Sequence, residues 1–283
     1  MPRRKRATSG SRRAAERAQP DGWRRALITG ASAGIGAAFA RRLAARGCDL
    51  VLVARRDSAL ERLGAELTAA HGIEVEAIAA DLTDADRVRA VERRLEESER
   101  PIDLLVNNAG SETEHAPFAI RDRELLAAEV YLNAAALMRL THAAVRSMVP
   151  RGVGAVLSVS AGAAFYPVPG SAAYGASKAF VNSLTEALSE ELRGTGVRVA
   201  AICPGFTRTE AQARLGLRSE IVPAAFWKEP DEVADAALRG LARGAVISNV
   251  GLLDALVAFL GRHLPRRLWL RSVARTQQRL KSA

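Results

Sequence analysis

The stretch YGASK, from Tyr174 to Lys178, places a tyrosine and a lysine four residues apart. Residues at this spacing share one face of a helix, so the lysine ammonium can approach the tyrosine hydroxyl. A neighbouring cation favours the phenolate and lowers the pKa of a phenol that is otherwise a weak acid. The pair could therefore exchange a proton with a bound ligand near neutral pH. Only four of the 41 basic residues are lysines, which indicates that an ammonium is needed here rather than a guanidinium.

A glycine-rich stretch, TGASAGIG, directly follows an apolar run and opens a helical one. Gly30, Gly34 and Gly36 leave no side chain where a pyrophosphate must approach the backbone. The free N–H groups at the start of a helix then bind the anion. The loop therefore predicts a dinucleotide site, although a plain glycine-rich turn is the alternative.

The end of the next apolar run indicates which dinucleotide is bound. An acidic side chain there would bond to the ribose 2′-hydroxyl of NAD(H), whereas a guanidinium suits the 2′-phosphate of NADP(H). The sequence has Arg55 and Arg56 at this point, and Ser32 is a second candidate donor to the phosphate. We therefore predict NADP(H) as the cofactor, with NAD(H) less favoured. A solvated arginine pair, with Asp57 blunting its charge, is the alternative interpretation.

Short apolar runs alternate with longer helical patterns along the chain. The runs that we expect as strands are 26–30, 49–55, 75–81, 103–110, 155–162 and 197–205, and the expected helices are 34–46, 57–71, 84–98, 122–148 and 172–193. This alternation predicts a single α/β domain of the Rossmann type, with a doubly wound parallel sheet covered by helices on both faces. Ligands of such a fold bind at the carboxyl ends of the strands, where the residues named above lie.

Two further strand ends carry polar residues. Asp81 follows the third run and is placed to touch the adenine edge, while NNAG, residues 107–110, follows the fourth and would lie beside the adenosine half. For both motifs a capping or turn role is the alternative.

The net charge of +10 is concentrated in the two ends of the chain. Residues 1–25 and residues 261–283 each carry +7, which leaves −4 on residues 26–260. An acidic body with basic ends argues against a nucleic-acid-binding fold, whose basic stripe lies on the fold itself. After Met1, residues 2–22 contain no large aliphatic or aromatic side chain, so we expect residues 1–22 to form a disordered basic extension.

The remaining composition excludes other classes of site. Cys48 and Cys203 lie far apart and the four histidines form no ligand pair, which argues against a disulfide scaffold or a metal site. We find neither a secretory signal nor an apolar run long enough to cross a bilayer, so the expected location is the cytoplasm.

Six motifs resemble, in order and spacing, those of the short-chain dehydrogenase/reductase family, over roughly residues 24–250. They are TGxxxGxG at 29–36, NNAG at 107–110, Asn133, Ser160, YxxxK at 174–178 and PGxxxT at 204–209. The resemblance implies hydride transfer between NADPH and a carbonyl or alcohol substrate. It implies that Tyr174 is the acid or base, that Lys178 tunes it and that Asn133 relays protons through water. It also implies that Ser160, with Ser158 as the rival, holds the substrate oxygen.

The same resemblance implies a set of cofactor-binding residues. These are Gly30, Ser32, Gly34, Ile35, Gly36, Arg55, Asp81, Leu82, Asn108, Ala109, Gly110, Tyr174, Lys178, Pro204, Gly205 and Thr209. It further implies a homodimer or homotetramer that forms through the helices carrying Asn133 and Tyr174.

The substrate side is less clearly defined. Ala161, Phe165, Tyr166 and Val168 favour a hydrophobic carbonyl compound or alcohol. By contrast, the stretch SETEH after NNAG is more acidic than the family pattern leads us to expect. Two other functions stay open at this point: a peripheral membrane or scaffold protein without turnover, and an epimerase or dehydratase on the same scaffold.

We assign residues 23–250 to the catalytic domain and residues 251–283 to an amphipathic basic extension. Apolar residues at 253, 256, 260 and 264 form a rough stripe, and Pro265 interrupts the helix before an arginine-rich segment. This extension suits contact with an anionic membrane surface, and packing on its own domain or in an oligomer interface is the alternative.

Overall fold

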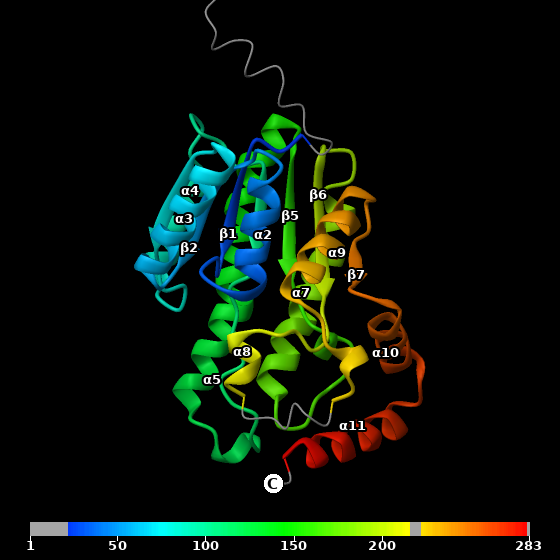
Figure 1. Ribbon diagram of the computed structural model, residues 1–283. Helices are drawn as coiled ribbons and strands as arrows, with labels where there is room; N and C mark the ends of the chain where they lie inside the picture. The colour runs from blue at the N-terminus through cyan, green and yellow to red at the C-terminus, as the bar shows by residue number, and fades with distance from the viewer. Residues whose placement is uncertain (1–21, 216–221, 282–283) are drawn as a thin grey trace, which may run out of the picture.

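The computed structural model describes residues 22–215 and 222–281. The predicted disordered extension, residues 1–22, lies outside this part of the chain apart from Gly22. Within the described residues, seven strands form one sheet in the order β3-β2-β1-β4-β5-β6-β7 (Figure 1). Every neighbouring pair is parallel, which confirms the predicted Rossmann-type fold. The strands are β1 Arg25–Thr29, β2 Asp49–Ala54, β3 Val75–Ala79, β4 Leu104–Asn107, β5 Gly154–Val159, β6 Val197–Cys203 and β7 Ile247–Asn249.

Helices cover both faces of the sheet because successive strand residues point to opposite sides. In β1, Ile28 packs into a core with helices α2, α3 and α9, and Leu27 packs into a second core with α4 and α6. The helices are α2 Gly34–Ala44, α3 Asp57–His71, α4 Ala85–Leu95, α5 Arg123–Val130, α6 Leu137–Met148, α7 Ala172–Glu191, α8 Glu210–Ala213, α9 Pro230–Ala242, α10 Leu252–His263 and α11 Arg266–Lys281. Short 3-10 turns are η1 Phe118–Ile120, η3 Val149–Arg151, η4 Gly162–Ala164 and η6 Ala224–Phe226.

The helix predicted over 122–148 is divided by a π-helical segment. Between α5 and α6 lies η2, Tyr131–Ala136, which contains Asn133. A π-helical segment widens the helix locally, and such segments are frequent at functional sites.

The stretch after β6, which the sequence pattern predicts to be irregular, contains α8, α9 and β7. Helix α9 begins at Pro230, and its start is fixed by reciprocal bonds between the side chains and backbones of Glu229 and Glu232. Proline at the first helical position and a capping box are both signals of a helix start. The sequence EPDEV therefore carried the signal for this helix.

Loops and helices at the carboxyl ends of the strands build the lower part of the molecule in Figure 1. This part contains α5, α8, α10 and α11, and α11 crosses below the sheet. None of the described helices is long and apolar enough to cross a membrane. Helix α10 ends before Pro265, as predicted.

Candidate active site

Tyr174 and Lys178 lie near the start of α7 and line a cleft at the carboxyl ends of the strands. The lysine Nζ donates a hydrogen bond to the main-chain oxygen of Val159, at 2.9 Å, and lies 5.6 Å from the centre of the Tyr174 ring. Within the described chain, no residue forms a hydrogen bond with the Tyr174 hydroxyl. The hydroxyl is therefore free to bind a ligand in the cleft.

The pKa values of this pair differ from the sequence-based expectation. Burial, followed by the charges of Glu112 and Glu129, raises the pKa of Tyr174 above its ordinary value. Burial also lowers the pKa of Lys178 to about 8. The direction of this shift is opposite to the one that the sequence pattern predicts for a phenol beside an ammonium, because burial penalises the phenolate. Tyr174 keeps its proton near neutral pH, as a proton donor must.

Asn133 is fully buried and holds the chain that follows Gly110. Its amide nitrogen donates to the main-chain oxygen of Ser111, at 2.7 Å, and its side-chain oxygen accepts from the N–H of the same residue, at 2.9 Å. A side chain at Gly110 would come within 3.0 Å of the Asn133 oxygen and 3.3 Å of the Lys178 Nζ. Asn133 and Lys178 therefore both lie close to Gly110. A larger residue at position 110 would crowd both side chains.

Ser160 lines the cleft, and in this structure its hydroxyl is bonded to the main chain. The hydroxyl donates to the main-chain oxygen of Lys178, at 3.2 Å, and lies beside the thiol of Cys203. To hold a substrate oxygen, the Ser160 side chain would have to rotate from this partner. Ser160 and Ala161 both line the cleft, whereas the rival Ser158 is buried within β5 and does not line it.

The glycine loop and the NNAG motif hold each other in place. Thr29 Oγ1 accepts from the N–H groups of Asn108 and Ala109, at 3.0 and 2.9 Å. The Asn108 amide donates to the main-chain oxygens of Thr29 and Gly30, at 2.9 and 3.2 Å. A Cβ at Gly36 would lie 2.3 Å from the Gly30 oxygen, so this close crossing requires glycine. Of the predicted loop residues, Gly30, Ser32, Gly34 and Ile35 line the cleft.

The cleft is lined by Arg56 and not by the predicted Arg55. Arg56 Nη2 lies 3.5 Å from Ser32 Oγ and 3.6 Å from a carboxylate oxygen of Glu210 in α8. Arg55 follows the last residue of β2 and Arg56 is the N-cap residue of α3, and both are exposed. The sequence therefore predicted an arginine at this strand end, and in the structure the neighbour of Arg55 lines the cleft.

Asp81 and Leu82 do not line this cleft. The Asp81 carboxylate accepts from the N–H and the hydroxyl of Thr83, at 3.0 and 2.8 Å, which is the turn-forming role weighed as its alternative. Leu82 is buried in the core beside α4.

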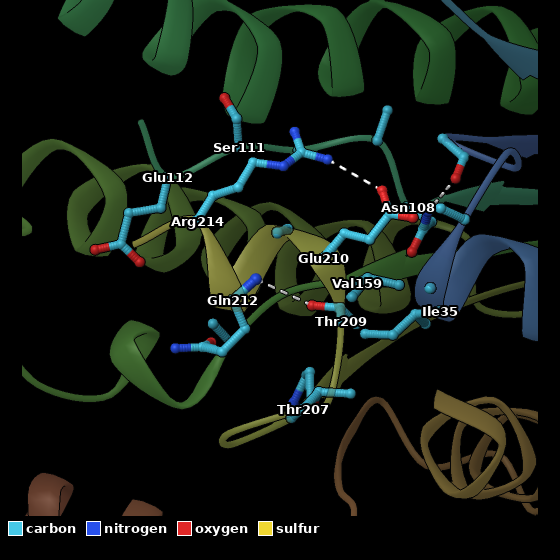
Figure 2. A pocket seen from close by; sticks show the side chains of 18 of the residues that line it. Ile35, Asn108, Ser111, Glu112, Val159, Thr207, Thr209, Glu210, Gln212 and Arg214 are labelled. Carbon is cyan, nitrogen blue, oxygen red and sulfur yellow. Dashed lines mark hydrogen bonds and ion pairs between the residues drawn. The ribbon is translucent and has the colours of Figure 1, made fainter. Parts of the chain in front are cut away.

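The PGxxxT motif forms the opposite wall of the cleft. Pro204, Gly205 and Thr209 line it, together with Asn108, Ala109 and Gly110 across the site. Figure 2 shows Thr209 with a dashed bond to Gln212, whose N–H the Thr209 hydroxyl accepts at 3.2 Å at the start of α8.

Most of the residues predicted to contact the substrate do not line the cleft. Ala161 lines the cleft, but Tyr166 packs edge-on against Trp269 of α11, with ring centres 5.5 Å apart. Phe165 lies under the guanidinium of Arg262, and Val168 is buried. Sequence reasoning could not foresee these contacts because they depend on the path of α10 and α11.

Several charged residues of the cleft were missed. Glu112, Glu210 and Arg214 all line it and are labelled in Figure 2. The acidic stretch SETEH was the only sequence signal for Glu112. Among the described residues, no three His, Cys, Asp or Glu side chains lie close enough together to hold a metal ion.

Comparison with known proteins gives a consistent result. The family model "short chain dehydrogenase" matches residues 24–219. Sulfoacetaldehyde reductase 2 of Chromohalobacter salexigens is 39% identical over 187 residues, which are 65% of this chain and 73% of that protein.

Two solved structures extend the similarity over most of the chain. A short-chain dehydrogenase from Sphingobium yanoikuyae in complex with NADPH has a TM-score of 0.76 and 38% identity, over 92% of this chain and 96% of that one. A bulky-bulky ketone specific alcohol dehydrogenase from Comamonas testosteroni has a TM-score of 0.72 and 31% identity, over 92% and 94% of the two chains.

Proposed function

Because the chain belongs to the short-chain dehydrogenase/reductase family, we propose that its cleft binds NADP(H) and transfers hydride between the nicotinamide and a carbonyl or alcohol substrate. The observation that carries this proposal is the unpartnered Tyr174 hydroxyl, which faces the cleft one helical turn from the buried Lys178. A phenol so placed can donate its proton to the substrate oxygen as hydride reaches the carbonyl carbon.

The cleft fits a dinucleotide at the start of α2. The N-cap residue of this helix is Ala33, whose side chain cannot accept a capping bond. The first N–H groups of the helix are therefore not occupied by a cap and can bind a pyrophosphate. Gly30 and Gly34 have φ values of 65° and 54°, a conformation that favours glycine and brings the backbone close to the ligand. When bound, the cofactor supplies or accepts the hydride.

Arg56 and Ser32 are the proposed contacts to the 2′-phosphate. In the structure, Glu210 interacts with Arg56, so this guanidinium already attracts an anion. Replacing Arg56 by alanine should lower the preference for NADPH over NADH by about 10- to 100-fold, because a charge-assisted hydrogen bond is lost. The Arg55→Ala variant is the matched control and should change the preference by less than about threefold. An equal loss in both variants would contradict this assignment.

The catalytic assignment is tested with Tyr174→Phe. Reduction of a panel of hydrophobic ketones and aldehydes, followed by NADPH absorbance, should fall by about 100-fold or more, because a general acid typically contributes 10²- to 10⁴-fold. NADPH binding, measured by fluorescence, should persist. Unchanged turnover in Tyr174→Phe would refute the role of this phenol.

Ser160 is proposed to hold the substrate oxygen after its hydroxyl leaves the Lys178 carbonyl. Loss of such a donor typically costs about 10²- to 10³-fold in kcat. Ser160→Ala should therefore lower kcat by this amount, whereas Ser158→Ala, inside β5, should act through stability alone. Asn133 is proposed to order a water beside Lys178, which would connect the lysine with solvent.

The proposed substrate has an apolar skeleton. Ile35, Val159, Ala161 and Leu215 contribute apolar surface to the cleft. The similarity to a bulky-ketone dehydrogenase supports the same proposal.

We further propose a homodimer or homotetramer that forms through the helices carrying Asn133 and Tyr174. Apolar side chains on these helices are exposed in the single chain, including Leu125, Val130, Met138 and Phe180. Light scattering should give a particle of two or four chains, and Phe180→Glu together with Met138→Glu should shift it toward one.

Residues 251–283 are proposed to contact anionic membrane surfaces as an extension of the catalytic domain, residues 23–250. In α10, Leu252 is 91% exposed and Phe259 is 56% exposed. The Arg267, Arg271 and Arg275 side chains of α11 are exposed as well. Co-sedimentation should occur with vesicles containing phosphatidylserine and not with pure phosphatidylcholine, and Phe259→Ser should weaken it.

A further inference from the structure

Glu112 places a carboxylate in the cleft that also holds Tyr174. Its side chain is 16% exposed. One carboxylate oxygen, Oε1, accepts a hydrogen bond from the hydroxyl of Ser171 and lies 3.6 Å from His115 Nδ1. No donor to the other oxygen, Oε2, is found among the described residues. This oxygen is therefore available to a ligand.

The backbone on both sides of Glu112 is anchored by buried side chains. Asn133 binds the N–H and the C=O of Ser111, as described above. The N–H of Thr113 donates to the Glu129 carboxylate, at 2.8 Å. Because both neighbours of Glu112 are fixed and Ser171 holds its Oε1, the carboxylate has little freedom to turn out of the cleft. A group held in this way binds a ligand without a large cost in conformational entropy.

Nearby cations do not neutralise Glu112. Arg214 lines the same cleft but binds Glu210, at 3.2 Å, and Figure 2 shows the Glu112 carboxylate pointing away from this pair. Arg121 binds the buried carboxylate of Glu129, at 3.1 Å.

His115 contacts Glu112 through the Ser171 hydroxyl, on the Oε1 side of the carboxylate. The single proton of the Ser171 hydroxyl goes to Glu112, so the hydroxyl oxygen accepts from His115 Nδ1–H at 2.6 Å. This bond occupies His115 Nδ1, and no bond from His115 to Glu112 Oε2 is found among the described residues. A carboxylate that is mostly removed from water is costly unless a cation or several donors face it.

We propose that Glu112 is a subsite for a protonated amine, so that the substrates are amino alcohols and the matching amino carbonyl compounds. This inference rests on the proposed function. The substrate ammonium donates to Glu112 Oε2 and supplies the missing positive charge, while the carbinol oxygen faces Tyr174. In reduction the carbonyl carbon accepts the hydride of NADPH and the carbonyl oxygen accepts the Tyr174 proton. Oxidation reverses both transfers, so the carbinol carbon gives its hydride to NADP⁺ and the hydroxyl proton passes to the phenolate oxygen of Tyr174. The C–N bond is unchanged.

Electrostatics at Tyr174 agrees with this arrangement. Glu112 is the first charge, after burial, that raises the pKa of the phenol. An ammonium bound to the carboxylate would offset that negative charge. A substrate with an amine would therefore lower the pKa of Tyr174 when it binds, and a substrate without an amine would not.

Three alcohols of similar size test the subsite with NADP⁺ as the oxidant: 1-amino-2-propanol, 1,2-propanediol and 2-butanol. For the wild-type enzyme, kcat/KM should be highest for the amine. In Glu112→Gln the ratio of kcat/KM for the amine to that for 2-butanol should fall by about 10- to 100-fold, the size of a charge-assisted hydrogen bond. Where turnover of these alcohols is too slow to measure, they are tested as inhibitors of the reduction of the best ketone of the panel. The ratio of the inhibition constants for the amine and for 2-butanol then replaces the ratio of kcat/KM.

The matched structural control is Ser171→Ala, which loosens the carboxylate but keeps its charge. This variant should lower the ratio by less than Glu112→Gln does. A change of less than threefold in Glu112→Gln, or equal effects on the diol and the amine, would overturn the amine subsite. If the ketone panel is reduced normally in those experiments, the proposed function survives; if the wild-type enzyme reduces no ketone, the proposed function itself fails.

Discussion

Replacing Lys178 by methionine is expected to stabilise the fold while abolishing turnover. The lysine is 4% exposed, and burial lowers its pKa from 10.5 to about 8. A difference of this size corresponds to a penalty of about 3 kcal/mol on the charged form at pH 7. Methionine removes this penalty and also the hydrogen bond to the Val159 oxygen, which is worth about 1 kcal/mol. The free energy of unfolding should therefore rise by about 2 kcal/mol.

The gain should depend on pH in a defined direction. Below pH 8 the lysine is protonated in both states, so the whole penalty on the folded state is present. Between pH 8 and 10.5 the unfolded chain still binds the proton while the folded chain has lost it, so wild-type stability rises with pH. The penalty should fall to about 1 kcal/mol near pH 10. The advantage of Lys178→Met should therefore shrink by about 2 kcal/mol from pH 7 to pH 10.

Urea unfolding followed by tryptophan fluorescence at pH 7 and at pH 10 measures both effects. The control is Lys228→Met, because Lys228 is only half-buried and bonds to the main-chain oxygen of Ala225 at the surface. This variant should show neither the gain nor its pH dependence. A Lys178→Met protein that is less stable than the wild type at pH 7, or a gap that does not narrow toward pH 10, would refute the reasoning.

Three further outcomes follow from single contacts. Gly36→Ala places a methyl 2.3 Å from the Gly30 oxygen, so thermal unfolding should show a loss of about 1–3 kcal/mol, and calorimetry should show loss of NADPH binding. Glu129→Gln leaves the Arg121 guanidinium buried without its anion, which should cost about 3–5 kcal/mol in urea unfolding; a loss below about 1 kcal/mol would contradict the ion-pair argument. Burial raises the pKa of the Cys48 thiol to about 12, so iodoacetamide should label this residue at pH 8 only in unfolded protein, as mass spectrometry can check.

The fold could be predicted from the sequence because its signals are local. Apolar runs bounded by glycine or polar residues marked β1 to β6, and the helix predicted over 57–71 is identical to α3. The six ordered motifs then identified the family, which the comparisons confirm. The π-helical turn around Asn133 escaped prediction because a single-residue change of helical period leaves no clear mark in the apolar pattern.

Residues of the site were harder to predict where their role depends on the direction in which the side chain points. Arg55 and Arg56 are identical in type, and only the direction of the chain after β2 shows which of them faces the cleft. Likewise Ser160 has the expected residue type, but its hydroxyl bonds to the Lys178 carbonyl. The orientation of the Glu112 carboxylate depends on a hydrogen bond from Ser171, which is 59 residues away in the sequence. A local sequence pattern cannot predict such a contact.

The two buried charges near the cleft have different origins, which the variants above can separate. Glu129 lies against Arg121, so removal of either partner leaves an unpaired charge and the fold loses stability. Lys178 has no carboxylate among its described contacts and is bonded to a main-chain oxygen, so its charge is a net cost to the folded state. Lys178 lowers the stability of the fold and lies beside the Tyr174 ring, so its presence is explained by a role in the reaction and not by packing. Opposite signs of the stability change in Glu129→Gln and Lys178→Met would therefore distinguish a structural ion pair from a functional ammonium in one experiment.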